Sequence, residues 1–382
     1  MVFQPSEMIL TAGPSITSRE LGYVVDAAQN GWNFHFKNYL GKFEKALANY
    51  VGTDHCVGMS SGTAALHVGL KLLGVGEGDE VIMPDLTFVS CANAVRFLGG
   101  TPVFVDVDPD TWCIDIDAME MAITPKTKVI MPVWMYGQAP RMDELMDVFH
   151  RKCVANDTNG WVLEDACPAL GTIYKGKKAG SWGHVSAFSF QGAKIAVMGE
   201  GGALLTNYGS FDKKARSLYS HGRDFDKEFW HSEVGFMYRL SNLQAALGLA
   251  QVERIEELAA KKRQIFQWYK DRLGDLDCIT MNADQPEARL NYWMPSIVLQ
   301  RSSLSRDELR SALKEKLIDT RPFFYPISKF SMYENCPRGN NRFSYYLGHH
   351  GINLPSGVWL DEERVDYIAC NIRELLTRKA VS

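Results

Sequence analysis

The 382-residue sequence lacks several features that would assign it to particular classes of protein. It has no excess of basic residues, since 41 lysines and arginines against 45 acidic residues give a net charge of −4. A nucleic-acid partner is therefore not expected. No apolar run approaches the roughly eighteen residues of a membrane-spanning helix, and the first residues lack the regions of a signal peptide. We expect a cytoplasmic protein without a membrane partner.

Cysteine is also scarce, with eight residues, and no two of them form a CxxC pair. Their spacing matches no zinc site, so we expect no metal. We interpret them as reduced thiols, most of which serve as small core residues. No internal repeat or low-complexity segment is visible.

The first two thirds of the chain alternate short apolar runs with helix-like segments such as Thr63–Leu73 and Met142–Cys153. This alternation indicates βαβ units in an α/β fold, with a mainly parallel central sheet flanked by helices. Ligands of such sheets bind at the carboxyl ends of the strands. The seven predicted strands are His55–Ser60, Glu80–Met83, Pro102–Val107, Lys128–Met135, Trp161–Glu164, Val185–Phe190 and Gly202–Thr206.

The pattern changes at a long helical stretch, Leu243–Leu273, which we interpret as a helix linking two domains. A smaller C-terminal α+β domain follows, so we place a large domain at 1–250 and a small one at 251–382. The elements predicted for the small domain are a strand at Tyr292–Leu299, a helix with a capping box at Ser305 and Glu308, a Pro-rich aromatic stretch at Arg321–Pro326 and a terminal helix at Asp361–Arg378.

Two segments carry residues suited to pyridoxal-phosphate (PLP) chemistry. FSFQGAK ends at Lys194 and is followed by the glycine-rich MGEGG. A lysine in such a turn can project into a cleft, where partial burial makes its amine competent for Schiff-base formation; a solvated surface lysine is the alternative. Asp165 ends the strand in VLEDA. An acid there can keep the pyridine nitrogen of PLP protonated, or it can cap a helix.

Two further segments suit the same cofactor. SSGTAALH leads from a strand into a helix through Ser61, Gly62 and Thr63, and is neither a Walker loop nor a GxGxxG motif. Backbone N–H groups at a helix start, together with two hydroxyls, can hold a phosphate, although simple helix capping is the alternative. Phe88, in PDLTFVS, follows another strand end. It could stack on an aromatic cofactor or belong to the core.

Taken together, these segments resemble the DegT/DnrJ/EryC1/StrS family of sugar aminotransferases. The resemblance covers nearly the whole chain. Besides the four segments above, it rests on FEKALANYVG, TPVFVDVD, LEDACPALG, YKGKKAG, FWHSEVGFMYRLSNLQAALGLAQ, TRPFFYP and INLPS. The resemblance implies the type I PLP-dependent fold, which is the aspartate-aminotransferase-like fold.

The family's roles carry over onto matching positions. Lys194 resembles the lysine that binds PLP as a Schiff base and moves the proton between the cofactor and the substrate. Asp165 matches the partner of the pyridine nitrogen, and Phe88 matches the stacking aromatic residue. Pyridoxamine phosphate is implied as the intermediate form of the cofactor. The phosphate ligands that the resemblance implies are Ser189, Ser61, Gly62, Thr63 and Asn242. Asn242 is implied to come from the neighbouring subunit, which in turn implies a homodimer with shared active sites.

Within the family, the chain is most similar to members that aminate C4 of a GDP-linked 4-keto-6-deoxymannose, with L-glutamate as the donor. A substrate pocket with Trp32, His35, Arg239 and Tyr325 is implied. Other aminotransferases of the family, acting at C4 or C3 of a dTDP- or UDP-linked sugar, are an alternative. A dehydratase branch carries histidine in place of the lysine, and a non-catalytic regulator is expected to lose Lys194 or Asp165.

The chain departs from the family pattern at three positions that border the sugar and nucleotide pockets in the family. Pro168 stands where a polar residue is usual, Trp134 where histidine is common, and Ser328 where a histidine often follows. The segment NFHFKNYL after Trp32 also lacks the usual small residues. These departures bear on the identity of the sugar rather than on the cofactor.

Overall fold

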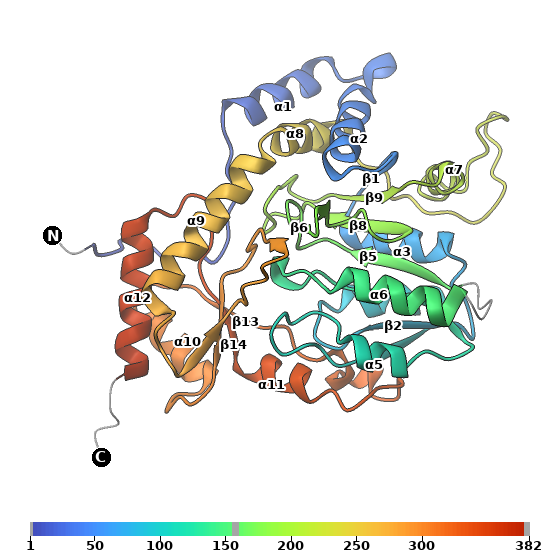
Figure 1. Cartoon of the computed structure of the whole chain (residues 1–382). Coiled ribbons are helices and arrows are strands. Elements are labelled where there is room, and N and C mark those ends of the chain that lie inside the picture. Colours follow the sequence, from blue (N-terminus) through green and yellow to red (C-terminus); the bar gives the residue numbers. More distant parts are fainter. Residues whose placement is uncertain (1–2, 155–159, 378–382) are drawn as a thin grey trace.

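The computed structural model describes residues 3–154 and 160–377, in which helices cover two larger sheets and a third, short sheet is also present (Figure 1). A seven-stranded sheet has the strand order β1-β9-β8-β5-β4-β2-β3. Neighbours from β3 to β8 pair in parallel, whereas β9 pairs antiparallel with both β8 and β1. Its strands are β1 (His55–Met59), β2 (Glu80–Pro84), β3 (Thr101–Val105), β4 (Thr127–Ile130), β5 (Trp161–Asp165), β8 (Val185–Ser189) and β9 (Gly202–Thr206). The prediction of a mainly parallel sheet is confirmed.

Apolar side chains on both faces of this sheet form two cores. One core lies under α3, α4 and α7, and the other lies under α2, α5, α6 and α8. Both faces are therefore covered, as the continuous apolar strands require. The helices are α2 (Asn38–Val51), α3 (Gly62–Leu72), α4 (Ser90–Arg96), α5 (Ile116–Met121), α6 (Met142–Phe149), α7 (Gly209–Leu218) and α8 (Asn242–Glu253).

A smaller antiparallel sheet, in the order β10-β12-β14-β13, packs against α9, α10 and α12 at the other side of the molecule (Figure 1). The capping box predicted at Ser305 and Glu308 is present at the start of α10. These elements are β10 (Ile279–Met281), β12 (Ser296–Leu299), β13 (Arg321–Pro322), β14 (Gly351–Asn353), α9 (Ile255–Leu273), α10 (Arg306–Glu315), α11 (Arg342–His350) and α12 (Glu362–Thr377). Residue 378, the predicted end of α12, lies outside the described residues.

The domain boundary near residue 250 stays a prediction, but the chain crosses between the two cores more than once. Ile9 belongs to the small-domain core, and its backbone N–H donates to Leu317 O at 2.8 Å. Conversely, Ile327 and Tyr333 belong to a core of the large sheet. Ile9 near the N-terminus and the segment 327–333 therefore each pack into the core of the other sheet.

Three predicted elements are shorter or broken in the structure. The strand predicted at Lys128–Met135 ends at Ile130, because Pro132 has no N–H to donate and pairing resumes only as an isolated bridge at Val133. The helix predicted over Leu243–Leu273 is two helices that meet at Arg254, whose buried guanidinium contacts Glu20 at 2.7 Å.

The strand predicted at Tyr292–Leu299 begins only at Ser296. Tyr292 has φ of 46°, outside the extended region, and Pro295 cannot donate a ladder hydrogen bond. Two short strands that were not predicted, β6 (Ile173–Tyr174) and β7 (Lys177–Lys178), pair with each other, and β6 also pairs with β11 (Ala288–Arg289). Among the described residues, no helix has both the length and the apolar character to cross a membrane.

Candidate active site

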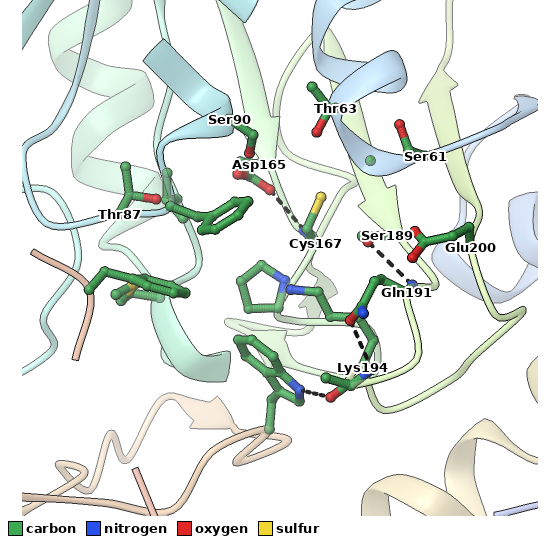
Figure 2. A pocket seen from close by; sticks show the side chains of 18 of the residues that line it. Ser61, Thr63, Thr87, Ser90, Asp165, Cys167, Ser189, Gln191, Lys194 and Glu200 are labelled. Atoms are coloured by element: carbon green, nitrogen blue, oxygen red, sulfur yellow. Dashed lines mark hydrogen bonds between the residues drawn. The ribbon is translucent and has the colours of Figure 1, made fainter. Parts of the chain in front are cut away.

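A cavity of about 320 Å³ lies at the carboxyl ends of the central strands (Figure 2). It is lined by residues that directly follow β1, β2, β5 and β8, which is where a parallel sheet collects its loops. Seven residues predicted for the cofactor lie in its wall: Ser61, Gly62, Thr63, Phe88, Asp165, Ser189 and Lys194. Among the described residues, no cluster of histidine, cysteine and acidic side chains is arranged to bind a metal ion.

Lys194 lies in the loop that connects β8 to β9 and reaches into the cavity (Figure 2). Backbone bonds close this loop, with Gly192 N donating to Gly199 O at 3.0 Å and Lys194 N donating to Gln191 O at 2.8 Å. Gly199 has φ of +79°, which a side chain would oppose. Burial lowers the pKa of Lys194, while Cys167 and Asp165 act in the opposite direction. The net effect favours the neutral amine that a nucleophile requires.

Asp165 ends β5 and is only 4% exposed. Its Oδ1 accepts a hydrogen bond from Cys167 N at 3.0 Å, and its Oδ2 accepts one from Cys91 Sγ at 3.0 Å. No helix starts at this point of the chain. Asp165 is therefore not a helix cap, and its carboxylate forms part of the cavity wall.

The start of α3 forms the opposite wall. Ser61 caps this helix through a 3.0 Å bond from Ala64 N to its Oγ. A Cβ at position 62 would lie 2.8 Å from Ser189 Cβ and 2.9 Å from Cys167 Sγ, so only glycine fits there. Gly62 thus brings the backbone of the helix start close to Ser189. Such an N-terminus, with the hydroxyls of Thr63 and Ser189, can hold a phosphate.

Aromatic side chains complete the cavity. Phe88 is 54% exposed and its ring centroid lies 5.5 Å from that of Phe324. Trp293 places its ring 3.9 Å from Lys194 Nζ. Trp293, Arg321 and Phe324 line the cavity but were not predicted as site residues. These three residues lie in the segments NYWM and TRPFFYP, and the family resemblance of those segments is the signal in the sequence that could have identified them. They are more than 90 positions away from Lys194 in the chain, so no local pattern links them to it.

The structure does not bring the predicted substrate residues to Lys194 within one chain. Trp32, Arg239 and Asn242 line a second cavity of about 320 Å³. His35 borders a separate hollow, where its Nδ1 lies 3.2 Å from Asn38 Nδ2. The hydroxyl of Tyr325 accepts a 3.2 Å hydrogen bond from Arg306.

Two of the three departures from the family pattern, Trp134 and Ser328, do not line this cavity. Trp134 is fully buried and donates from Nε1 to Glu164 at 3.0 Å. Ser328 is 2% exposed and donates from Oγ to Asp85 at 2.6 Å. Both side chains satisfy buried carboxylates. Only Pro168 lines the cavity, as expected.

A family model described as the DegT/DnrJ/EryC1/StrS aminotransferase family matches residues 14–373. The chain belongs to this family. It is 38% identical over 366 residues to GDP-perosamine synthase of Escherichia coli O157:H7, covering 96% of this chain and 98% of the relative. It is 37% identical over 370 residues to GDP-perosamine synthase of Caulobacter vibrioides, with the same coverage of each.

Solved structures of this DegT/DnrJ/EryC1/StrS family agree with the fold. A Streptococcus pneumoniae protein described as a sugar aminotransferase, in its PLP form, is 28% identical with a TM-score of 0.89, covering 97% of this chain and all of the other. DesI, solved in the presence of its TDP-sugar product, is 27% identical with a TM-score of 0.87, covering 98% of this chain and 94% of the other. The predicted type I fold and aminotransferase class are confirmed.

Proposed function

We propose that this chain transfers an amino group from L-glutamate to C4 of a nucleotide-linked 4-keto-6-deoxy sugar. The best candidate substrate is GDP-4-keto-6-deoxymannose, and the product is then GDP-perosamine. The placement of Lys194 and Asp165 in one cavity carries the proposal, since it combines a half-buried amine with a buried carboxylate. The two relatives named GDP-perosamine synthase support the nucleotide and the sugar.

PLP is the cofactor that these residues fit. The cavity offers an amine at Lys194, a carboxylate at Asp165, and a helix start with Ser61, Gly62 and Thr63 for a phosphate. Ser189 adds a hydroxyl to this phosphate cradle, and Phe88 offers an aromatic face. When bound, PLP supplies the electron sink that stabilises negative charge at the substrate carbon beside the nitrogen.

Lys194 has two roles in this proposal. Its Nζ would hold PLP covalently. With glutamate bound in place of this bond, the free amine of Lys194 would move a proton at the glutamate carbon, and one water would be consumed as 2-oxoglutarate is released. With the keto sugar bound, Lys194 would return the proton, and one water would be released as the amino sugar forms. Asp165 keeps the ring nitrogen protonated throughout.

The proposal includes a homodimer with shared active sites. Asn242 contacts Tyr39 N at 2.9 Å on its own chain and lies in the second cavity, away from Lys194. The surface of the chain also carries very exposed apolar side chains, with Phe34 at 98% and Phe229 at 87%. A second copy that covered these side chains could also bring Asn242 to the cofactor phosphate.

Complementation tests the shared site. Lys194→Ala and Asn242→Ala should each be inactive alone, and mixing them through unfolding and refolding should restore activity by forming one complete site per dimer. Asn335→Ala, at an exposed asparagine outside both cavities, is a control that should keep its activity alone. A monomer in sedimentation analysis, or mixtures that stay inactive, would contradict the shared site.

We also propose that the enzyme acts in the cytoplasm and that its product enters polysaccharide biosynthesis. Cys56, Cys91 and Cys113 are buried and form no disulfide, as suits a reducing compartment. The role in polysaccharide synthesis rests on analogy with the family. Cell fractionation and analysis of the glycan after deletion of the protein test these two points.

The decisive experiment measures 2-oxoglutarate release from glutamate, with PLP and one keto sugar at a time. Turnover with GDP-4-keto-6-deoxymannose alone supports the proposal, and NMR of the product distinguishes C4 from C3 amination. Turnover only with dTDP-4-keto-6-deoxyglucose would move the function to a dTDP-sugar aminotransferase. Lys194→Ala should abolish turnover, whereas the exposed Lys177→Ala should not. An active Lys194→Ala variant would contradict the mechanism.

A further inference from the structure

Cys91 contacts the carboxylate of Asp165 from a part of the chain far away in sequence. It lies in the first turn of α4 and is fully buried. Its Sγ lies 3.0 Å from Asp165 Oδ2, which is short for a hydrogen bond that involves sulfur. Because a buried carboxylate is stabilised by each hydrogen bond that it accepts, this contact bears on the function of Asp165.

We propose that Cys91 is a positioning residue, whose thiol donates a hydrogen bond that fixes the carboxylate of Asp165 toward the cavity. Its role in turnover rests on the proposed function, in which Asp165 holds the ring nitrogen of PLP. Asp165 then has one donor on each oxygen, Cys91 Sγ on Oδ2 and Cys167 N on Oδ1. Two donors fix the rotation of the carboxylate and leave further lone pairs for the cofactor.

The surroundings keep Cys91 in its protonated form. Burial, followed by the charge of Asp165, raises the pKa of this thiol well above its ordinary value. A protonated thiol has one S–H group, and Cys91 donates it in the hydrogen bond to the carboxylate of Asp165. The hydroxyl of Thr87, 3.7 Å from Cys91 Sγ and 2% exposed, is then the donor in its contact with the sulfur. The three side chains form a short chain of donors that ends on Asp165.

A neutral donor suits this position. A cation beside Asp165 would compete with the protonated ring for the carboxylate, while an apolar residue would leave Oδ2 with less stabilisation in a buried place. Cys91 therefore orients the carboxylate without neutralising its charge. Cys167, the other thiol at the site, contributes its backbone N–H to Asp165 instead.

Infrared spectroscopy of the cofactor-free protein tests the hydrogen bond directly. The S–H stretching band of Cys91 is obtained as the difference between the native protein and Cys91→Ala. We expect this band to lie at higher frequency in an Asp165→Asn background, because a neutral amide is a weaker acceptor than a carboxylate. A band that does not move would overturn the proposal, whatever the protein's substrate.

Cofactor binding and turnover test the positioning role. Cys91→Ala should weaken PLP binding and lower kcat by about tenfold each, as expected for losing a hydrogen bond to a charged group. Cys91→Ser keeps a donor and should stay within about threefold of the native protein on both measures. Cys56→Ala removes a buried thiol elsewhere in the core and should match the native protein.

Equal losses in Cys91→Ser and Cys91→Ala, or a Cys91→Ala variant that binds PLP and turns over as the native protein does, would overturn the positioning role. These outcomes differ from a failure of the proposed function. If the proposed function is wrong, the native protein itself takes up no PLP or turns over no keto sugar. The infrared comparison still decides whether Cys91 donates to Asp165.

Discussion

The Nζ atom of Lys194 lies 3.9 Å from the centre of the Trp293 ring, and the indole N–H of Trp293 donates to Ala193 O at 2.7 Å. One side chain of the small domain therefore contacts both the functional amine and the backbone that carries it. The backbone N–H of Trp293 donates a 2.8 Å hydrogen bond to Asn291 Oδ1, which holds Trp293 in place. Asn291 in turn donates to Pro168 O and Leu170 O, in the loop that follows Asp165.

This contact predicts that Trp293→Phe lowers kcat by about tenfold, with a smaller effect on the KM for glutamate. Phenylalanine keeps an aromatic face near the amine but loses the hydrogen bond to Ala193, which is a contribution of about 1 kcal/mol. Steady-state kinetics at saturating PLP measure the effect. Trp359→Phe, at a half-exposed tryptophan outside the cavity, is the control. An unchanged kcat in Trp293→Phe would show that the hydrogen bond to Ala193 does not position Lys194.

Asp165→Asn should lower kcat by two or more orders of magnitude while the protein stays folded. Asparagine has the same shape but no charge, so the protonated ring nitrogen loses its partner and the electron sink weakens. The rate of each half-reaction, followed by the absorbance of the bound cofactor, measures the loss. Asp110→Asn is a control at an exposed position. A native rate in Asp165→Asn would mean that Asp165 is not the partner of the ring nitrogen.

Gly62→Ala should weaken PLP binding by at least about tenfold. The added Cβ would lie 2.8 Å from Ser189 Cβ and 2.9 Å from Cys167 Sγ, so it pushes apart the wall that is proposed to hold the phosphate. Equilibrium titration with PLP measures the affinity. Gly22→Ala is a matched control in α1 (Ser18–Asn30), where an added Cβ meets nothing within 4 Å. Native affinity in Gly62→Ala would place the phosphate elsewhere.

Lys262 predicts a dependence of stability on pH. It is 3% exposed, and its Nζ donates to Trp293 O at 3.0 Å and to Ser356 Oγ at 2.9 Å. Burial lowers its pKa from 10.5 to about 7. Between these values the folded protein holds the neutral amine while the unfolded chain still binds the proton, so unfolding takes up a proton. The free energy of unfolding should therefore rise with pH from about 7 to 10.

The rise contributed by Lys262 is at most about 1.4 kcal/mol per pH unit. Denaturant unfolding of the native protein and of Lys262→Met at pH 7, 8 and 9 measures it, because the difference between the two proteins cancels the other titrating groups. Methionine keeps the length of the side chain without a charge. A difference that stays constant across this range would mean that Lys262 remains charged in the folded protein, held by its carbonyl acceptors.

The sequence alone determined the large sheet and seven of the residues that line the cavity. The seven predicted strands all occur, because each is an apolar run that a sheet covered on both faces must bury. Lys194, Asp165, Ser189 and Gly62 follow the ends of such strands, and a parallel sheet gathers these ends at one edge. Local signals of this kind need no knowledge of distant contacts.

Only the tertiary structure decided the remaining parts. Trp293 and Phe324 reach the cavity from the small domain, and Cys91 meets Asp165 across 74 positions of the chain. Trp134 and Ser328 turn inward because buried Glu164 and Asp85 need hydrogen-bond donors. Each of these outcomes depends on a partner that is distant in sequence. Residue type and spacing cannot specify such a partner, because the fold as a whole brings the two side chains together.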